Sequence, residues 1–277
     1  MRFVMFKKTF QTVRDTVPLI HNITNYVTVN DVANALLACG ASPIMSDDAM
    51  EVEEITSICG GLNINIGTLN QNTIPSMFLA GKKANELNHK VLLDPVGAGA
   101  SSLRTKTAMD LIEKVKFDVI RGNISEIKAI AGSSSNTKGV DASSLDAVTE
   151  ENLDEAVSFM KDLAGRFGCV VAATGKYDLV ADSSKCYVIK NGLAQMEKIT
   201  GTGCQLSGII TAFICANPDC VLEATAAAIC LMGLAGEIAF EKLLPEDGNS
   251  TYRNKIIDAI YNMTAEDLQK GAKYEIK

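Results

Sequence analysis

The composition of this 277-residue chain favours an enzyme that acts on small molecules over a binder of nucleic acid or anionic membrane. Its 26 basic and 33 acidic residues give a net charge of −7, whereas such binders normally carry a basic field. Hydrophobic residues make up 47% of the chain, which is enough for a sizeable core. We expect a single domain over residues 1–277, with no nucleic-acid or membrane partner.

The start of the chain and its longest apolar stretch both argue against export or membrane insertion. A four-residue apolar run precedes Lys7 and Lys8, and a secretory signal needs a longer one. Residues 221–240 contain Glu223 and Glu237, which favours a buried core helix over a membrane span. The eight cysteines form no C-x-x-C pair, so most of them fit reduced structural thiols. We expect a cytoplasmic protein.

Short apolar runs alternate with longer segments of helical spacing, which predicts an α/β domain with a largely parallel sheet. Strands are expected at 62–66, 91–93, 117–120 and 170–173. Helices are expected at 75–88, 102–116 and 153–167. The Ser- and Gly-rich residues 132–144 predict a surface loop.

The pattern changes after residue 174. Short strands are expected at 178–181, 186–190 and 193–196. Asn191-Gly192 is typical of a type I′ hairpin turn, and an antiparallel edge is common on a mostly parallel sheet. Helices are expected at 204–216, 221–240 and 250–263. Thr264 with Asp267 three residues later predicts the capped start of a last helix.

Polar residues follow several of the predicted strands at the point where each strand ends. Asp94, Arg121, Asn123 and Thr174 occupy such positions, and Glu126 begins the helix that follows Asn123. In an open parallel sheet, ligands bind at the carboxyl ends of the strands. The sequence therefore predicts a ligand site at this edge, although polar residues also end strands that bind nothing.

The sharpest local feature is the run Thr200-Gly201-Thr202-Gly203-Cys204, which leads straight into an apolar helix. Its two glycines permit a tight turn, after which the free N–H groups of the helix start converge. Such groups can hold a phosphate or the charge that develops in phosphoryl transfer. The alternative is a tight turn without a ligand, and no Gly-Lys-Ser/Thr follows to make a P-loop.

With these segments the chain resembles the hydroxyethylthiazole kinases, a thiamine-pathway family of the ribokinase-like superfamily. The matching segments occur in family order, at Pro18–Val27, Gly40–Met45, Leu62–Leu69, Asp94–Ala100, Arg121–Glu126 and Gly201–Cys204. Many relatives in the superfamily carry Asp where this chain has Cys204, and the thiazole kinases resemble it in having Cys. Two features depart from the family pattern: Gln205, often apolar in the family, and the pair Asp47-Asp48.

The resemblance implies a ribokinase-like three-layer fold with a mostly parallel central sheet flanked by helices. It implies ATP-dependent phosphorylation of the hydroxyl of 4-methyl-5-(2-hydroxyethyl)thiazole in thiamine biosynthesis or salvage, with Mg²⁺ as cofactor. Three subunits assemble in this family, and the thiazole pocket lies between neighbours. A homotrimer is therefore implied, in which Asn25 serves the site of an adjacent chain.

The resemblance also implies roles for individual residues. Gly201, Thr202, Gly203 and Cys204 would form the anion hole around the transferring phosphoryl group. Cys204 would be the catalytic residue beside the acceptor hydroxyl, and its place at a helix N-terminus would lower the pKa of its thiol.

The remaining implied contacts are divided between the thiazole, ATP and the metal. Met45, Gly201 and Asn25 would contact the thiazole. Arg121 and Thr174 would contact ATP. Asp94 and Glu126 are the candidates for Mg²⁺, which prefers one or two carboxylates plus phosphate oxygens. His21 is expected to be a hydrogen-bonded structural residue.

Three other functions compete with this one. The first is a ribokinase-like kinase of another alcohol, such as a hydroxymethylpyrimidine or a sugar. The second is a Rossmann-type dehydrogenase, which expects G-x-G-x-x-G after the first strand; the two G-x-G runs here come late and lack the third glycine. The third is a catalytically silent metabolite-binding regulator, against which the joint presence of Asp94, Arg121, Glu126 and Cys204 weighs.

Overall fold

A single nine-stranded sheet runs through the computed structural model, which describes residues 5–132 and 147–277. The expected loop at 132–144 lies, beyond Gly132, outside the described residues. The strand order is β2-β1-β3-β4-β5-β6-β7-β8-β9. The strands are β1 (Leu19–Ile23), β2 (Ser42–Met45), β3 (Gly61–Asn65), β4 (Lys90–Asp94), β5 (Val119–Asn123), β6 (Val170–Thr174), β7 (Asp178–Ala181), β8 (Cys186–Ile189) and β9 (Tyr274–Ile276).

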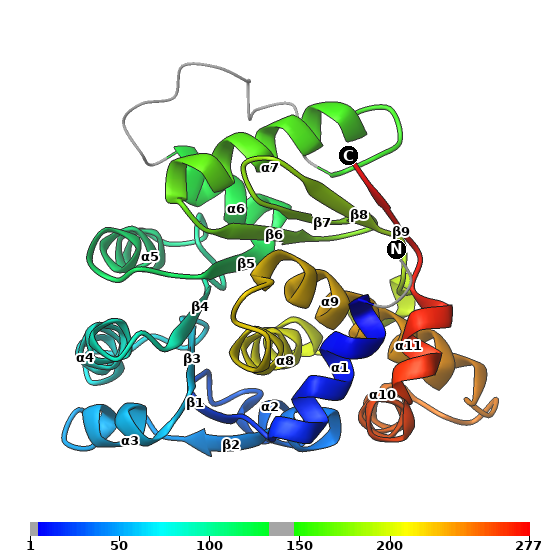
Figure 1. Ribbon diagram of the computed structural model, residues 1–277, viewed down its shortest axis with the longest axis horizontal. Helices are drawn as coiled ribbons and strands as arrows, with labels where there is room; N and C mark the ends of the chain where they lie inside the picture. The colour runs from blue at the N-terminus through cyan, green and yellow to red at the C-terminus, as the bar shows by residue number, and fades with distance from the viewer. Residues whose placement is uncertain (1–4, 133–146) are drawn as a thin grey trace.

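Helices cover both faces of this sheet (Figure 1). On one face lie α3 (Val52–Ile58), α4 (Thr73–Glu86), α5 (Ser102–Lys114), α6 (Ile124–Gly132) and α7 (Leu153–Phe167). On the other lie α1 (Met5–Thr16), α2 (Val29–Cys39), α8 (Thr202–Ala216), α9 (Val221–Glu241), α10 (Asn249–Asn262) and α11 (Ala265–Gly271). Strands β1 to β6 pair in parallel, and β7 to β9 pair antiparallel. The expected α/β fold with a mostly parallel, helix-flanked sheet is confirmed.

Side-chain alternation along the strands gives the sheet two apolar cores. In β4, Leu92 belongs to the core shared with α8 and α9, whereas Leu93 belongs to the core shared with α4 and α5. Successive strand residues point to opposite faces, so a run of apolar residues buries both faces at once. Both leucines are fully buried.

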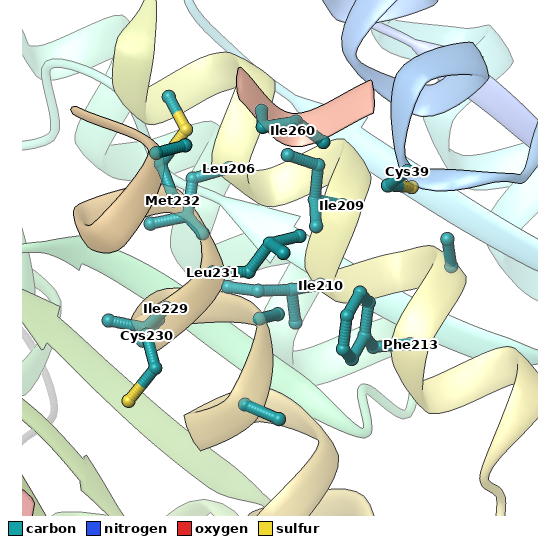
Figure 2. Packing of buried hydrophobic residues seen from close by; sticks show 14 of the residues in the cluster. Cys39, Leu206, Ile209, Ile210, Phe213, Ile229, Cys230, Leu231, Met232 and Ile260 are labelled. Atoms are coloured by element: carbon teal, nitrogen blue, oxygen red, sulfur yellow. The ribbon is translucent and has the colours of Figure 1, made fainter. Parts of the chain in front are cut away.

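Helix α9 is long and apolar enough to cross a membrane by length and composition, and 78% of its most apolar window is buried inside the structure. It packs against α8 and α10, as expected of a core helix. Figure 2 shows the contact between these helices. We define the helix cluster as five fully buried side chains at this contact: Ile209, Ile210, Phe213, Leu231 and Ile260.

Two expectations for the antiparallel edge are wrong. Residues 193–196 do not form a strand, because Ala194–Lys198 is the 3-10 helix η3. Asn191-Gly192 does not turn a hairpin, because β8 pairs with the C-terminal strand β9 instead. The side chain of Asn191 is buried and bonds to that C-terminal segment: its amide donates to Gly271 O (3.0 Å) and its oxygen accepts from Lys273 N (2.7 Å).

The last helix begins as its sequence predicts. The Thr264 side chain accepts from the backbone N–H of Asp267, and the Asp267 carboxylate accepts from the backbone N–H of Thr264. This reciprocal capping box satisfies two donors that the helix start leaves free. It fixes α11 just ahead of β9, the strand that closes the sheet.

Candidate active site

Helix α8 begins at the edge of the sheet where the parallel strands end, and it packs against β3 and β4. Gly201 precedes it with φ of 87°, in the left-handed region, and a Cβ there would lie 2.2 Å from Thr28 Cγ2. Glycine is therefore required at this turn. The first helical hydrogen bond runs from Gln205 N to Gly201 O, so the N–H groups of Thr202, Gly203 and Cys204 precede the hydrogen-bond ladder.

Asp94, at the end of β4, is fully buried at this edge. Its Oδ2 accepts from Asn65 Nδ2 and from Ser207 Oγ, both at 2.8 Å, and lies 3.6 Å from Arg121 Nη1. Burial raises the pKa of Asp94 to about 6; the negative charge of Glu126 adds to the rise, while Arg121, Ser207 and Asn65 oppose it. Its Oδ1 has no hydrogen-bond partner within the described part of the chain. One carboxylate oxygen thus remains available to a ligand.

Arg121, in β5, links Asp94 to the end of the next strand. Its Nη2 donates to Thr174 Oγ1 at 2.6 Å. The residue is 8% exposed, and its Nε lacks a hydrogen-bond partner among the residues that the structure describes. A buried guanidinium with unused donors suits the planar oxygens of a phosphate.

Cys204 lies in the first turn of α8 and is buried beside the segment that follows β1. Asn25 Nδ2 donates to Cys204 Sγ and to Asn65 Oδ1, both at 3.1 Å, while Asn25 Oδ1 accepts from Thr28 Oγ1 at 3.0 Å. The side chain of Asn25 is therefore held in place by residues of its own chain. It joins Cys204 to the same network as Asp94.

The expected lowering of the Cys204 pKa is also wrong. Burial raises the pKa of this thiol, and the nearby Asp94 carboxylate raises it further. Hydrogen bonds from Thr28, Asn25 and Asn65 act in the opposite direction but do not reverse the shift. The sulfur is removed from water and lies near a carboxylate, and both effects disfavour the thiolate. Cys204 is a neutral thiol at pH 7.

Glu126 lies in the first turn of α6 and is bonded to the backbone of two segments. Its Oε1 accepts from Gly97 N at 2.7 Å, and its Oε2 accepts from Asn123 N at 2.8 Å. The carboxylate thus orders the loop that follows Asp94 and remains close enough to raise the pKa of that acid. Glu126 and Asp94 form a pair of carboxylates at the same edge.

This pair is compatible with Mg²⁺ but not with a metal held by protein ligands alone. No group of three or more His, Cys, Asp or Glu within residues 5–132 and 147–277 could hold a metal ion. Mg²⁺ needs only one or two carboxylates, because waters and phosphate oxygens complete its shell. The unpartnered Oδ1 of Asp94 meets that requirement.

A cavity of about 550 Å³ opens beside the start of α8. Its lining includes polar residues: Arg121, Asn123, Thr174, Lys176, Asp178, Asn191, Glu197 and Thr202. It also includes apolar residues: Leu193, Ala194, Met196, Leu206, Ile229 and Met232. A cavity with both kinds of lining can hold a ligand that has a charged end and an apolar end.

Met45 and His21 lie at the other side of the site. Met45 ends β2 opposite Asn22 of β1, is half-buried, and is not among the residues that line the cavity. His21 is fully buried; its Nε2 bonds to Ser46 O (3.0 Å) and its Nδ1 to Thr56 Oγ1 (2.9 Å). His21 is the structural residue expected, and it fixes the backbone directly after Met45.

Sequence reasoning missed several residues of this network. Ser207 and Asn65 both bond Asp94, and Asp178 lines the cavity beside Thr174. Helical spacing from Cys204 could have indicated Ser207, because residues three apart share a helix face. Gln205 is buried, and neither of its side-chain polar atoms has a partner in the described residues.

Comparison with known proteins supports the resemblance drawn from the sequence. The model of the hydroxyethylthiazole kinase family matches residues 10–266. A hydroxyethylthiazole kinase of Clostridium acetobutylicum is 59% identical over 271 residues, which is 98% of this chain and 99% of the relative. One of Clostridium tetani is 46% identical over 272 residues, or 97% and 98%.

Solved structures agree with these relatives. The structure of a hydroxyethylthiazole kinase protein from Pyrococcus horikoshii OT3 covers 100% of both chains with a TM-score of 0.87 and 34% identity. A pyridoxal kinase from Staphylococcus aureus, in complex with AMP-PCP and pyridoxal, has a TM-score of 0.60 at 14% identity, with coverage of 94% and 99%. That second likeness indicates a shared fold alone.

Proposed function

The chain belongs to the hydroxyethylthiazole kinase family, and we propose from that membership and from the site geometry that it phosphorylates a thiazole alcohol. The γ-phosphoryl group of ATP passes to the hydroxyl of 4-methyl-5-(2-hydroxyethyl)thiazole, a step of thiamine biosynthesis or salvage. Such an enzyme is a transferase, and the kinase activity follows from the family.

One observation carries this proposal: two different environments meet at the start of α8. Thr202 and Gly203 line the cavity with Arg121 and Thr174, whereas Cys204 turns toward Asn25, two residues after the end of β1. A nucleotide that enters from the cavity side and an alcohol that enters from the β1 side would therefore meet at the N–H groups between them. Phosphoryl transfer depends mainly on such positioning and on charge stabilisation.

The anion hole consists of the N–H groups from Gly201 to Cys204. These donors lie at a helix N-terminus, where the helix dipole also favours negative charge. Arg121 supplies a positive charge on the cavity side and Thr174 holds its guanidinium. The three groups together favour the charge that spreads over the transferring phosphoryl oxygens.

Cys204 positions the acceptor hydroxyl as a neutral thiol rather than as a base. Its raised pKa leaves the proton on sulfur at pH 7, and Asn25 holds the sulfur in place. A strong base is not essential for phosphoryl transfer, since the alcohol proton can leave late. Met45, Gly201 and Asn25 contact the thiazole in this proposal.

Asp94 and Glu126 hold Mg²⁺, directly or through water. The bound ion supplies positive charge to the phosphate oxygens. Asp94 supports this role through its unpartnered Oδ1, and Glu126 through its hold on the loop that follows Asp94.

The assembly proposed is a homotrimer with the thiazole pocket between subunits. Tyr26 is 77% exposed and Val27 57% exposed, directly after Asn25. Large apolar side chains left in solvent beside a site suit burial against a neighbouring subunit. Sedimentation equilibrium tests this directly, and a monomer at micromolar concentration would exclude it.

Two further proposals concern the chain as a whole. We place the enzyme in the cytoplasm, because its eight cysteines are all unpaired and the cytoplasm keeps thiols reduced. We treat residues 1–277 as one kinase domain, because one sheet takes strands from both ends of the chain.

The test of the activity is a mass-spectrometric assay for the phosphorylated thiazole after incubation with Mg-ATP. Hydroxymethylpyrimidine, pyridoxal and a sugar serve as competing alcohols. We expect the thiazole to be phosphorylated with the highest kcat/KM of the panel. Phosphorylation of another alcohol with the thiazole left unmodified would overturn the proposal, and no transfer to any alcohol would favour a silent regulator.

A further inference from the structure

One wall of the cavity is formed by the chain that follows β8. Asn191, Gly192, Leu193, Ala194 and Met196 all line the cavity there. Only one short helical turn, η3, stabilises this segment internally. Its position must therefore come from contacts with other parts of the chain.

Helix α9 supplies several of these contacts. A Cβ on Gly233 would lie 2.7 Å from Asn191, so the wall rests directly on the helix. One turn further along, Glu237 Oε1 accepts from Gly192 N at 2.9 Å and from Asn191 Nδ2 at 3.2 Å. A carboxylate that accepts N–H bonds from a loop is a strong and directional anchor.

The C-terminal segment joins the same anchor. Lys273 Nζ lies 2.6 Å from Glu237 Oε2, and Lys273 N donates to Asn191 Oδ1 at 2.7 Å. The Glu237 side chain is 15% exposed and the Lys273 side chain 57% exposed, so the carboxylate is largely shielded from water while the ammonium group is not. One carboxylate thus connects the cavity wall, α9 and the residue before β9.

We propose that Glu237, paired with Lys273, is a positioning residue that shapes the cavity wall for the base of the nucleotide. This inference rests on the proposed function, in which the phosphates lie at the start of α8. The base then lies against Leu193 and Met196. Glu237 acts on the base through Asn191 and Gly192 and does not touch the reacting atoms.

Two substitutions at Glu237 separate its contacts. Glu237→Gln keeps an oxygen for Gly192 N and loses the ion pair, whereas Glu237→Met loses both. We expect KM for ATP to rise about 3-fold in Glu237→Gln, which loses one charge-assisted bond. We expect it to rise about 10-fold in Glu237→Met, which loses both. Lys273→Met should match Glu237→Gln. The values of kcat and of KM for the thiazole should stay unchanged.

A second ion pair provides the control. Asp247 Oδ2 accepts from Leu244 N (2.9 Å) and from Lys255 Nζ (2.8 Å), so it also holds a backbone N–H and a lysine. Neither of these residues lines the cavity. Asp247→Asn and Lys255→Met should therefore leave KM for ATP unchanged, even where they lower the melting temperature as much as the Glu237 variants do.

Calorimetric titration of adenosine and of inorganic triphosphate locates the effect. We expect Glu237→Met to raise Kd for adenosine about 10-fold and to leave Kd for triphosphate unchanged, because the wall faces the base. An equal rise for both ligands, or no rise for adenosine, would overturn the inference. These titrations measure binding and need no turnover. Wild-type protein that binds adenosine but phosphorylates no thiazole would therefore refute the proposed function, and the inference about Glu237 would still be tested by the titrations.

Discussion

Helix α8 buries two kinds of side chain, one on each side of its axis. Toward the sheet, Cys204 and Ser207 belong to a strand-end cluster, which we define as Asn25, Asn65, Asp94, Arg121, Cys204 and Ser207. Away from the sheet, Ile209, Ile210 and Phe213 belong to the helix cluster (Figure 2). Both clusters are buried, yet the strand-end cluster leaves Asp94 Oδ1 and Arg121 Nε unpartnered within the described residues.

The difference shows how the molecule divides stability from binding. A buried polar atom without a partner costs free energy in the folded chain, and a ligand that supplies the partner regains it. A buried apolar side chain contributes its full share to folding whether or not a ligand is bound. Substitutions in the helix cluster should therefore lower stability and leave activity intact. Substitutions in the strand-end cluster should lower activity and change stability little.

The largest effect is expected in the helix cluster. Phe213 is fully buried and stacks on Phe10, with ring centroids 5.7 Å apart. Phe213→Ala should lower the free energy of unfolding by about 3–5 kcal/mol, measured by urea denaturation. Phe240, 38% exposed on α9, is the control, and Phe240→Ala should cost about 1 kcal/mol.

The same variant also tests whether stability and ligand binding are separate in this molecule. Folded Phe213→Ala should keep the wild-type KM for both ATP and the thiazole at a temperature well below its transition. A tenfold change in either KM in fully folded protein would show that the helix cluster also controls the site. The two regions would then not be separable.

Asp94→Asn is the matching substitution in the strand-end cluster. The amide keeps the shape of Asp94 but removes the negative charge that faces Arg121 and the proposed metal. We expect kcat to fall by about 100- to 1000-fold, as when one preorganised charge is lost from a site. The free energy of unfolding should change by less than in Phe213→Ala, because the raised pKa of Asp94 means that its charge is costly when buried.

Asp110→Asn controls for the loss of one negative charge. Asp110 lies on α5 at the surface, paired with Lys106. Its substitution should leave kcat unchanged. Wild-type kcat in Asp94→Asn would remove Asp94 from the mechanism and would make the strand-end cluster a structural network only.

The same two regions differ in how well the sequence predicted them. Apolar spacing gave 153–167 as a helix with the bounds that α7 has, and strand-end positions gave Asp94, Arg121 and Thr174. Periodicity and the geometry of parallel sheets are local or general rules, so one sequence carries them. Helical spacing alone predicted the three helices that carry the helix cluster, at 204–216, 221–240 and 250–263.

Long-range pairing was not predictable in the same way. Asn191-Gly192 has the composition of a hairpin turn, but strand β9, more than 80 positions further along, takes the place beside β8. The Cys204 thiol shows the same limit, since its place at a helix N-terminus predicted a lowered pKa while burial and Asp94 raise it. Both errors arose where a contact from a distant part of the chain outweighed the local signal.

The next prediction concerns how the free energy of unfolding depends on pH. Asp178 lies outside both clusters but lines the cavity, and its Oδ1 accepts from Gly175 N at 2.9 Å. Burial raises its pKa to about 7, against the opposing effects of Gly175 N–H and Arg121. Between pH 4 and 7 the folded chain therefore holds a proton that the unfolded chain has lost. The free energy of unfolding should fall as pH rises through this range.

Asp178→Asn should flatten that dependence by about 2 kcal/mol between pH 5 and pH 8, measured by urea denaturation at each pH. The amide oxygen still accepts from Gly175 N, so the turn remains intact. Asp182 is the control of opposite sign: burial opposes the N–H groups of Lys185 and Ser184, which prevail and lower its pKa. An equal slope in wild type and Asp178→Asn would show that Asp178 titrates as it does in water.

The smallest effect is expected at Cys204, the first residue that α8 contributes to the strand-end cluster. Its thiol is neutral, buried and held by Asn25, so it can orient the acceptor hydroxyl without taking its proton as a thiolate would. Cys204→Ser and Cys204→Ala should lower kcat about 10-fold, near 1.4 kcal/mol of transition-state stabilisation, and leave KM for ATP unchanged.

Cys204→Asp should remain active, because a carboxylate at this position can also bond the hydroxyl. Steady-state kinetics with the thiazole, together with a melting temperature for each variant, checks the whole series. A well-folded Asp variant without activity would mean that the site requires a neutral group there. In that case the strand-end cluster would not tolerate a second carboxylate beside Asp94.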